Sequence, residues 1–116
     1  MKKQIKNLSL HELDFLVAKD EGLDVKIYKD DLGDSCLAKA KEGITWHTYS
    51  PTTNPSQAWP IIERDRINIT YGDNNSYSWI DGGNGKYGKT SLEAAMRCYV
   101  ASKFGDEVDM DNLINK

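Results

Sequence analysis

The sequence has only three prolines and two cysteines, no long apolar run and no excess of basic residues. No run of apolar residues approaches the ~20 needed to span a bilayer, so we expect no transmembrane helix. A net charge of −3 and a pI near 5.3 disfavour duplex nucleic-acid binding, which usually requires a strong basic excess. The first lysines are not followed by an apolar segment, so we expect a cytoplasmic protein with both thiols reduced.

The candidate metal ligands are equally sparse. His11, His47, Cys36 and Cys98 show no metal-ligand spacing with one another, and the acidic runs lack the spaced oxygens of a calcium loop. We therefore expect no metal and no cofactor. The chain contains no repeat, linker or low-complexity tract, and its 116 residues predict a single domain over 1–116.

The first clear element is a helix over 10–20. Ser9 and Glu12 form a capping-box pattern at its start, and Gly22 follows its end, where a residue with positive φ is favoured. Apolar residues recur at helical spacing on one face. These residues are Leu10, Leu13, Leu16 and Val17.

The second clear element is a helix over 91–104. Thr90 and Glu93 form another capping-box pattern, and Gly105 follows the helix. A wide apolar stripe runs along it. The stripe consists of Leu92, Ala95, Met96, Tyr99 and Val100.

The remaining periodic segments predict short antiparallel strands. Residues 66–81 read as a β-hairpin around the turn GDNN: Ile67, Ile69 and Tyr71 alternate on one strand, and Tyr77 and Trp79 alternate on the facing strand. An alternating strand is also expected near 25–28, while 29–45 stays undecided between strand and helix. The sequence therefore predicts an α+β fold in which a small antiparallel sheet, with a central hairpin at 66–81, is packed by helices 10–20 and 91–104.

The segment 46–60 carries all three prolines and three large aromatic residues. We expect an ordered loop with at most one helical turn after Pro55, since each proline restricts the residue before it. Trp46, Tyr49 and Trp59 are the candidate protein-contact residues, because exposed aromatic side chains on a stiff loop suit protein recognition. The alternative, weighted equally, is that these rings cap the hydrophobic core.

The stretch GGNGKYGKTS, residues 82–91, matches the phosphate-binding loop pattern between Gly83 and Thr90. The strand before it belongs to a hairpin, however, whereas nucleotide-binding enzymes of this class use a parallel sheet. No apolar strand ending in aspartate follows to hold Mg²⁺. We therefore interpret the match at 83–90 as coincidental, a flexible loop leading to the N-cap residue Thr90, and expect no ATP or GTP binding.

One nucleophilic pair remains conceivable, because catalytic partners need only be close in space. Cys98 would be the nucleophile and His47 its base. Cys98 lies among alanines on a helix flank, so packing as a small apolar residue is the favoured interpretation. We predict no catalytic residues.

The segments YSPTTNPSQAWPIIERDRI, TSLEAAMRCYVASKFGDEV and LSLHELDFLVAKDEGL resemble the NinX-like family of small tailed-phage proteins, whose function is unknown. The resemblance covers most of the chain and is weakest at 24–44. Members of the family tend to have Thr-Pro where this chain has Thr90-Ser91, and they carry no phosphate-binding loop there. The resemblance implies a phage or prophage accessory product and supplies no catalytic residues.

Together these observations predict a non-catalytic accessory protein that binds an unidentified host or phage protein. The first alternative is a nucleic-acid-associated factor in phage replication or recombination, with Lys86, Lys89 and Arg97 as a local basic patch. The second is a small enzyme that uses the loop at 83–90. The sequence leaves the oligomeric state open.

Overall fold

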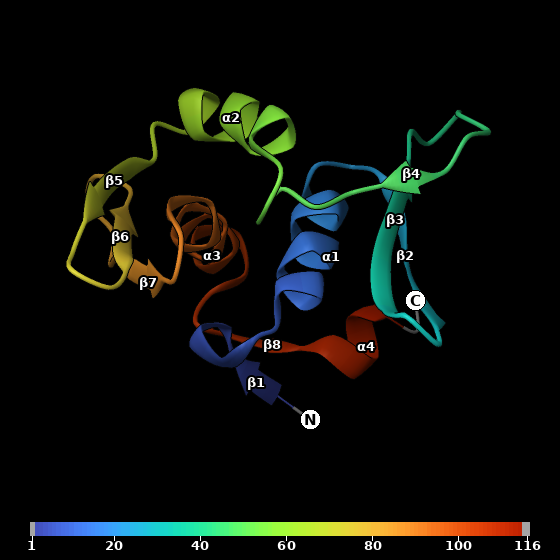
Figure 1. The fold of residues 1–116 in the computed structure, drawn as a ribbon, viewed down its shortest axis with the longest axis horizontal. Coiled ribbons are helices and arrows are strands. Elements are labelled where there is room, and N and C mark those ends of the chain that lie inside the picture. The colour runs from blue at the N-terminus through green and yellow to red at the C-terminus, as the bar shows by residue number, and fades with distance from the viewer. Residues whose placement is uncertain (1, 115–116) are drawn as a thin grey trace.

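The structure is a computed structural model that describes residues 2–114. Two central helices pack against each other, and three small antiparallel sheets surround them (Figure 1). The elements in chain order are β1 (Lys2–Gln4), a 3₁₀ turn η1 (Ile5–Asn7), α1 (Leu10–Asp20), β2 (Asp24–Asp30), β3 (Gly33–Lys39), β4 (His47–Thr48), α2 (Pro55–Arg64), β5 (Asn68–Tyr71), β6 (Ser76–Trp79), β7 (Lys86–Gly88), α3 (Ser91–Phe104), β8 (Glu107–Asp109) and α4 (Met110–Ile114). The predicted α+β class is confirmed.

Both predicted helices are confirmed at both ends. Ser9 accepts a hydrogen bond from the backbone N–H of Glu12, and the Glu12 carboxylate accepts from the N–H of Ser9, so the capping box of α1 is complete. The capping box expected at α3 is only half formed. Thr90 accepts from the N–H of Glu93 at 3.1 Å, but the Glu93 carboxylate instead accepts from Arg97, one turn along the helix.

The strands divide into three sheets among residues 2–114, with orders β1-β8, β2-β3-β4 and β5-β6-β7. The hairpin expected at 66–81 is confirmed as β5 and β6, and β6 is the central strand of its sheet. The undecided segment 29–45 contains β3, which pairs with β2 over seven residues. In Figure 1 the β5–β7 sheet lies beside α3, the β2–β4 sheet lies beyond α1, and the β1–β8 pair lies below both helices.

The hydrophobic core lies where α1 meets α3. Leu13, Leu16 and Val17 of α1 and Met96 and Val100 of α3 have no exposed side-chain surface. Each helix also covers one sheet: α1 lies against β2 and β3, and α3 lies against β5, β6 and β7. The two sheets are therefore held apart by the helix pair, and each has one face left towards solvent.

The predicted loop over 46–60 is wrong in its second half. Pro55–Arg64 forms helix α2, with Asn54 as N-cap and Pro55 in the first turn, where proline is favoured. Pro60 lies inside this helix. The helix persists because its apolar face is anchored, with Ala58, Ile61 and Ile62 buried in the core, while Pro60 itself is exposed.

Candidate interaction surface

Strand β6 of the β5–β7 sheet turns its aromatic residues outward and its serines inward. Ser76 and Ser78 of β6 are buried, at 4% and 0% exposure, on the face that packs against α3. Tyr77 and Trp79 alternate with these serines along the strand. They therefore lie on the opposite face of the sheet, since successive side chains of a strand point to opposite faces. A half-buried sheet normally presents the reverse pattern, with apolar side chains inward and polar side chains outward.

The serines allow the sheet and α3 to approach closely, at a cost. The Ser78 hydroxyl is fully buried and has no hydrogen-bond partner among residues 2–114. An unpaired buried hydroxyl is unfavourable. On the inner face of the sheet, strand β6 thus contributes small residues, while Ile69 of β5, opposite Ser78, supplies a large apolar one.

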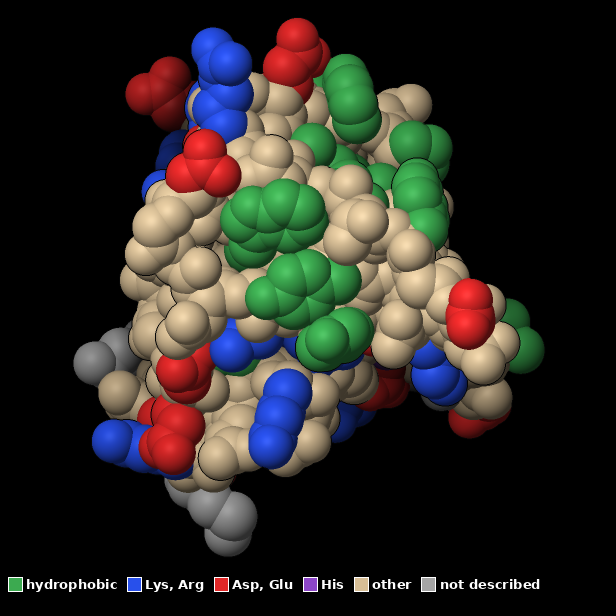
Figure 2. All heavy atoms as spheres, turned by 90° about the vertical axis from the view of Figure 1, so that its left-hand side faces the viewer, with side chains coloured by type: hydrophobic (Ala, Val, Ile, Leu, Met, Phe, Trp, Pro, Cys, Tyr) green, Lys and Arg blue, Asp and Glu red, His purple; other side chains and the backbone are tan. Residues whose placement is uncertain are grey.

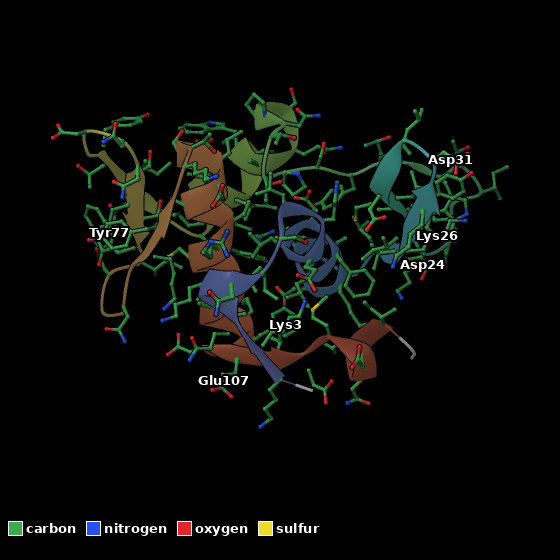
Figure 3. All side chains as sticks on the ribbon, turned by 60° about the horizontal axis from the view of Figure 1, so that its bottom comes forward. Lys3, Asp24, Lys26, Asp31, Tyr77 and Glu107 are labelled. Carbon is green, nitrogen blue, oxygen red and sulfur yellow. The ribbon has the colours of Figure 1, made fainter. Side chains whose placement is uncertain are left out.

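The outward rings form a continuous cluster. Tyr77 lies directly opposite Tyr87 of β7 in the strand register. The ring centroids of Tyr77 and Tyr87 are 4.8 Å apart, and those of Tyr77 and Trp79 are 5.8 Å apart at an interplanar angle of 29°. Tyr87 is 62% exposed. We call Tyr77, Trp79 and Tyr87 the aromatic face; Figure 2 shows hydrophobic side chains gathered over this sheet, and Figure 3 shows Tyr77 pointing away from α3.

Trp59 is the one predicted contact residue that lies open to solvent near this sheet. Its ring is 56% exposed on α2, and it lines a hollow of about 430 Å³ together with Asn68 of β5. Asn68 pairs with Trp79 in the strand register and therefore lies on the outward face. The hollow thus extends from Trp59 to Asn68, the residue that pairs with Trp79 of the aromatic face.

The other two predicted contact residues lie elsewhere. Tyr49 is in the core, 7% exposed, so its ring is not available to a partner. Trp46 precedes β4 and lies over the β2–β3 sheet, where the ammonium groups of Lys26 and Lys39 are 4.3 and 5.4 Å from its ring centroid. The three rings therefore form no common surface, because 46–60 divides into a short strand, a buried turn and a helix.

The stretch 83–90 does not have the geometry of a phosphate-binding loop. Residues 86–88 form strand β7, paired antiparallel with β6. One of its glycines is needed for packing: a Cβ on Gly88 would lie 2.4 Å from the backbone nitrogen of Ala94. A Cβ on Gly85 would lie 2.1 Å from the Tyr77 ring, so that ring would have to shift. Both distances are far below ordinary contact, so the glycines allow close approach of neighbouring groups.

The start of α3 also offers little to an anion. A phosphate would be bound by the free backbone N–H groups of the first turn. Here the N–H of Glu93 donates to the Thr90 hydroxyl, and the N–H of Ala94 donates to the Thr90 carbonyl at 3.0 Å. Gly88 lies directly against this turn. The match to the phosphate-binding pattern therefore has a structural explanation, since Gly88 allows close packing against α3 and Thr90 caps the helix.

The candidate catalytic and metal-binding residues are not assembled into a site. Cys98 is buried in α3, where burial raises the pKa of its thiol, whereas His47 is exposed on β4, which lies on the far side of α1 from α3 (Figure 1). Burial likewise raises the pKa of Cys36 to about 12, so neither thiol is an activated nucleophile. No cluster of three or more metal-ligating side chains occurs among residues 2–114.

The suggested basic patch is also not formed. Arg97 is 6% exposed, and its guanidinium donates to the carbonyl of Leu8 at 3.2 Å and to the Glu93 carboxylate at 2.9 Å. Lys86 is paired with Asp106 at 3.1 Å. Of the three cations, only Lys89 is exposed. No helix within 2–114 is long and apolar enough to cross a membrane.

The family model described as "Bacteriophage P22, NinX" matches residues 4–103. The chain belongs to this NinX family. The match covers α1, α2, α3 and all three strands of the β5–β7 sheet, so the aromatic face lies within the family's region. No curated protein shows significant similarity to the chain. The family has no known function, so membership supports a phage accessory protein and assigns no activity.

Proposed function

We propose that this NinX family member is a non-catalytic phage accessory protein that binds a host or phage protein through the aromatic face. The observation that carries the proposal is the outward placement of Tyr77, Trp79 and Tyr87 while Ser76 and Ser78 occupy the interior of the same sheet. Exposed aromatic clusters are unfavourable in water, and they are typical of interface hot spots.

The charges around the aromatic face support a protein partner. The Asp81 carboxylate accepts a hydrogen bond from Asn68, which also donates to the carbonyl of Trp79, so an acid lies at the edge of the ring cluster. Arg97, one of the three cations suggested for a nucleic-acid site, is buried and donates to the Leu8 carbonyl and the Glu93 carboxylate. Figure 2 shows both basic and acidic side chains beside the ring cluster, so its surroundings lack the strong basic excess that a phosphate backbone favours, whereas a protein would be recognised mainly by its apolar groups.

Trp59 extends the proposed contact area. Its exposed ring on α2 borders the hollow that reaches Asn68, so a partner seated on the aromatic face can place a side chain in that hollow. Of the three aromatic residues of segment 46–60 that the sequence suggests as contact residues, we retain only Trp59. Tyr49 serves the core instead, and Trp46 packs over the β2–β3 sheet.

The test compares exposed tyrosines on two different sheets. Tyr87→Ala removes a ring from the aromatic face, and Tyr28→Ala removes a ring that is 51% exposed on β2. Affinity-tagged protein is recovered from infected host cells, and bound proteins are identified by mass spectrometry. We expect both variants to keep the wild-type melting temperature, and Tyr87→Ala and Trp59→Ala to lose a partner that Tyr28→Ala retains. A partner retained by Tyr87→Ala would contradict the proposal.

The second candidate is binding of single-stranded nucleic acid, which the stacked arrangement of Tyr77 and Trp79 favours because bases stack on such rings. Titration with a deoxythymidine oligomer, followed by tryptophan fluorescence at low and high salt, separates the two functions. Quenching that weakens steeply with salt and disappears in Tyr87→Ala would establish the nucleic-acid function instead.

A further inference from the structure

We propose that the segment of the partner that docks on the aromatic face is proline-rich and uncharged, and that it lies there as a polyproline II helix. This inference rests on the proposed function, because it names the chemistry that the same surface recognises. A polyproline II helix makes no hydrogen bonds within itself, so its carbonyl groups all remain free to accept them. Proline-rich segments dock on aromatic-lined surfaces in this conformation, which they already hold before binding.

The outward face of the β5–β7 sheet is built from uncharged side chains. The strand register places five paired residues on this face, namely Asn68 and Thr70 of β5, Tyr77 and Trp79 of β6, and Tyr87 of β7. Three of them are aromatic, and the other two carry an amide and a hydroxyl group. The sheet itself therefore offers no opposite charge to an acidic segment, a basic segment or a phosphate backbone.

The charges around these strands balance one another. Within two residues of the strand ends the chain carries the bases Arg66 and Lys89 and the acids Asp73 and Asp81. Lys86 pairs with Asp106. The hollow beside Trp59 is lined by Glu63 and Arg66, again one acid and one base. The surroundings thus favour a ligand of neither sign, in agreement with the mixed charges beside the ring cluster in Figure 2.

The polar ends of the three rings are available donors. Within the described part of the chain, the hydroxyls of Tyr77 and Tyr87 and the indole N–H of Trp79 donate to no other group of the protein. A proline-rich segment supplies free carbonyl acceptors and has no N–H at proline. An α-helical segment has already paired most of its carbonyls, so it would exclude water from these donors without replacing it. The aromatic face therefore selects a polyproline II segment over an apolar helix.

The ring cluster is about as long as one turn of such a helix. The centroid of the Tyr77 ring lies 4.8 Å from that of Tyr87 and 5.8 Å from that of Trp79. One turn of polyproline II contains three residues and rises about 9 Å, so residues i and i+3 return to the same side. Two prolines with P-x-x-P spacing can therefore contact the cluster together.

The probe is acetylated and amidated decaproline, an uncharged peptide that forms a polyproline II helix by itself. The control is its mirror image built from D-proline, which has the same composition and the opposite hand. In ¹⁵N-labelled protein the indole N–H signals, assigned with single Trp→Phe variants, report binding, and Trp46, over the β2–β3 sheet, is the internal reference. We expect a saturable shift of the Trp79 signal with a Kd below about 1 mM and no shift of Trp46. Binding of the D-peptide should be weaker by about tenfold or more.

Variants locate the contact and test the donors, and circular dichroism checks that each is folded. Tyr87→Ala is expected to weaken decaproline binding by about tenfold or more, whereas Tyr28→Ala, on the β2–β4 sheet, leaves it unchanged. The double variant Tyr77→Phe/Tyr87→Phe keeps both rings and removes both hydroxyls, so we expect binding weaker by about threefold or more. Wild-type affinity in this double variant would overturn the inference, because a surface that needs no donors does not select a carbonyl-rich segment.

Three other outcomes decide against a proline-rich segment. Equal binding of the two mirror-image peptides would show a non-specific apolar contact. A Trp79 shift that depends on protein concentration alone would assign the face to a second copy of the chain. A Trp79 shift with a deoxythymidine oligomer and none with decaproline would assign the face to single-stranded nucleic acid.

Failure of this inference is distinguishable from failure of the proposed function. We expect decaproline, added to the complex recovered from infected cells, to release the partner. If Tyr87→Ala loses the partner but decaproline neither binds nor releases it, the proposed function stands and the proline-rich segment is excluded. If Tyr87→Ala retains the partner while decaproline shifts Trp79, the proposed function fails and the chemistry inferred for the surface is supported.

Discussion

Replacing Asp14 by asparagine tests the electrostatics of the core. Asp14 lies on α1 and is 2% exposed. Its carboxylate accepts the backbone N–H of Thr52 at 2.9 Å and the Thr52 hydroxyl at 3.0 Å, which ties α1 to the buried turn before α2. Burial raises the pKa of Asp14 from 3.8 to about 6, although the bonds from Thr52 and the charge of His11 oppose the rise.

The direction of the pH dependence follows from this pKa. Between pH 3.8 and about 6 the folded protein holds a proton on Asp14 that the unfolded chain has released. Stability is therefore highest on the acidic side of this window and falls as the pH rises through it. Raising the pKa from 3.8 to about 6 corresponds to about 3 kcal/mol, a large part of the ~5–15 kcal/mol that stabilises a domain.

Asp14→Asn removes the titrating carboxyl group and can keep both hydrogen bonds to Thr52. The asparagine oxygen can accept from the N–H of Thr52, and its amide can donate to the Thr52 hydroxyl. We expect a variant that is about 1–3 kcal/mol more stable than wild type at pH 7 and whose stability is flat between pH 4 and 6. Urea denaturation at half-unit pH steps, with unchanged m-values, measures both effects.

Two controls separate charge from hydrogen bonding. Asp14→Ala leaves the buried N–H of Thr52 without its acceptor, so we expect a loss of about 1–3 kcal/mol relative to Asp14→Asn at every pH. Glu63→Gln, an exposed change on α2, should reproduce the wild-type pH profile. The argument is refuted if wild-type stability rises steadily from pH 4.5 to 7, or if Asp14→Asn keeps the wild-type slope.

Three further predictions concern the β5–β7 sheet and the start of α3, each measured by urea denaturation. Gly88→Ala should destabilise the fold by about 1–3 kcal/mol, because the new Cβ would lie 2.4 Å from the Ala94 nitrogen. The control Gly83→Ala, whose Cβ would lie 3.4 Å from its nearest neighbour, should cost well under half as much, and equal costs would contradict the packing role of Gly88. Thr90→Ala should destabilise by about 1 kcal/mol through loss of the N-cap, and an unchanged midpoint would show that the cap is dispensable. Ser78→Ala should stabilise by about 1 kcal/mol because it removes a buried hydroxyl that has no partner within 2–114; destabilisation would indicate that the hydroxyl is bonded.

Local signals in the sequence predict the helices well because the capping groups are neighbours in the chain. Ser9, Glu12 and Thr90 act within one turn of the helix that they begin, and Gly22 and Gly105 adopt positive φ where the helices end. Such interactions need no tertiary partner, so the bounds of α1 and α3 were predictable to the residue.

Elements that depend on distant contacts were not predictable in the same way. Helix α2 contains Pro60, which interrupts its hydrogen bonding, and the helix is held by burial of Ile61 and Ile62 against the core. The half-formed capping box of α3 has a similar cause, since Glu93 pairs with Arg97, and Arg97 in turn bonds to the carbonyl of Leu8. Both outcomes depend on residues that are far apart in the sequence.

The aromatic face shows why the candidate site could not be predicted from alternation alone. The hairpin was predictable, but its register places Thr70 opposite Tyr77 and Asn68 opposite Trp79, so the aromatic set of β6 lies on the other face from Ile69 of β5. A shift of one residue would have turned Tyr77 and Trp79 towards α3. In β7, Gly88 pairs with Ser76 on the face towards α3, where a Cβ would lie 2.4 Å from the Ala94 nitrogen, so this position has no room for the side chain of Tyr87. Gly88, which contributes to the phosphate-loop pattern, therefore occupies the close-packed position against α3 and leaves Tyr87 on the solvent side, where we propose that it binds a partner.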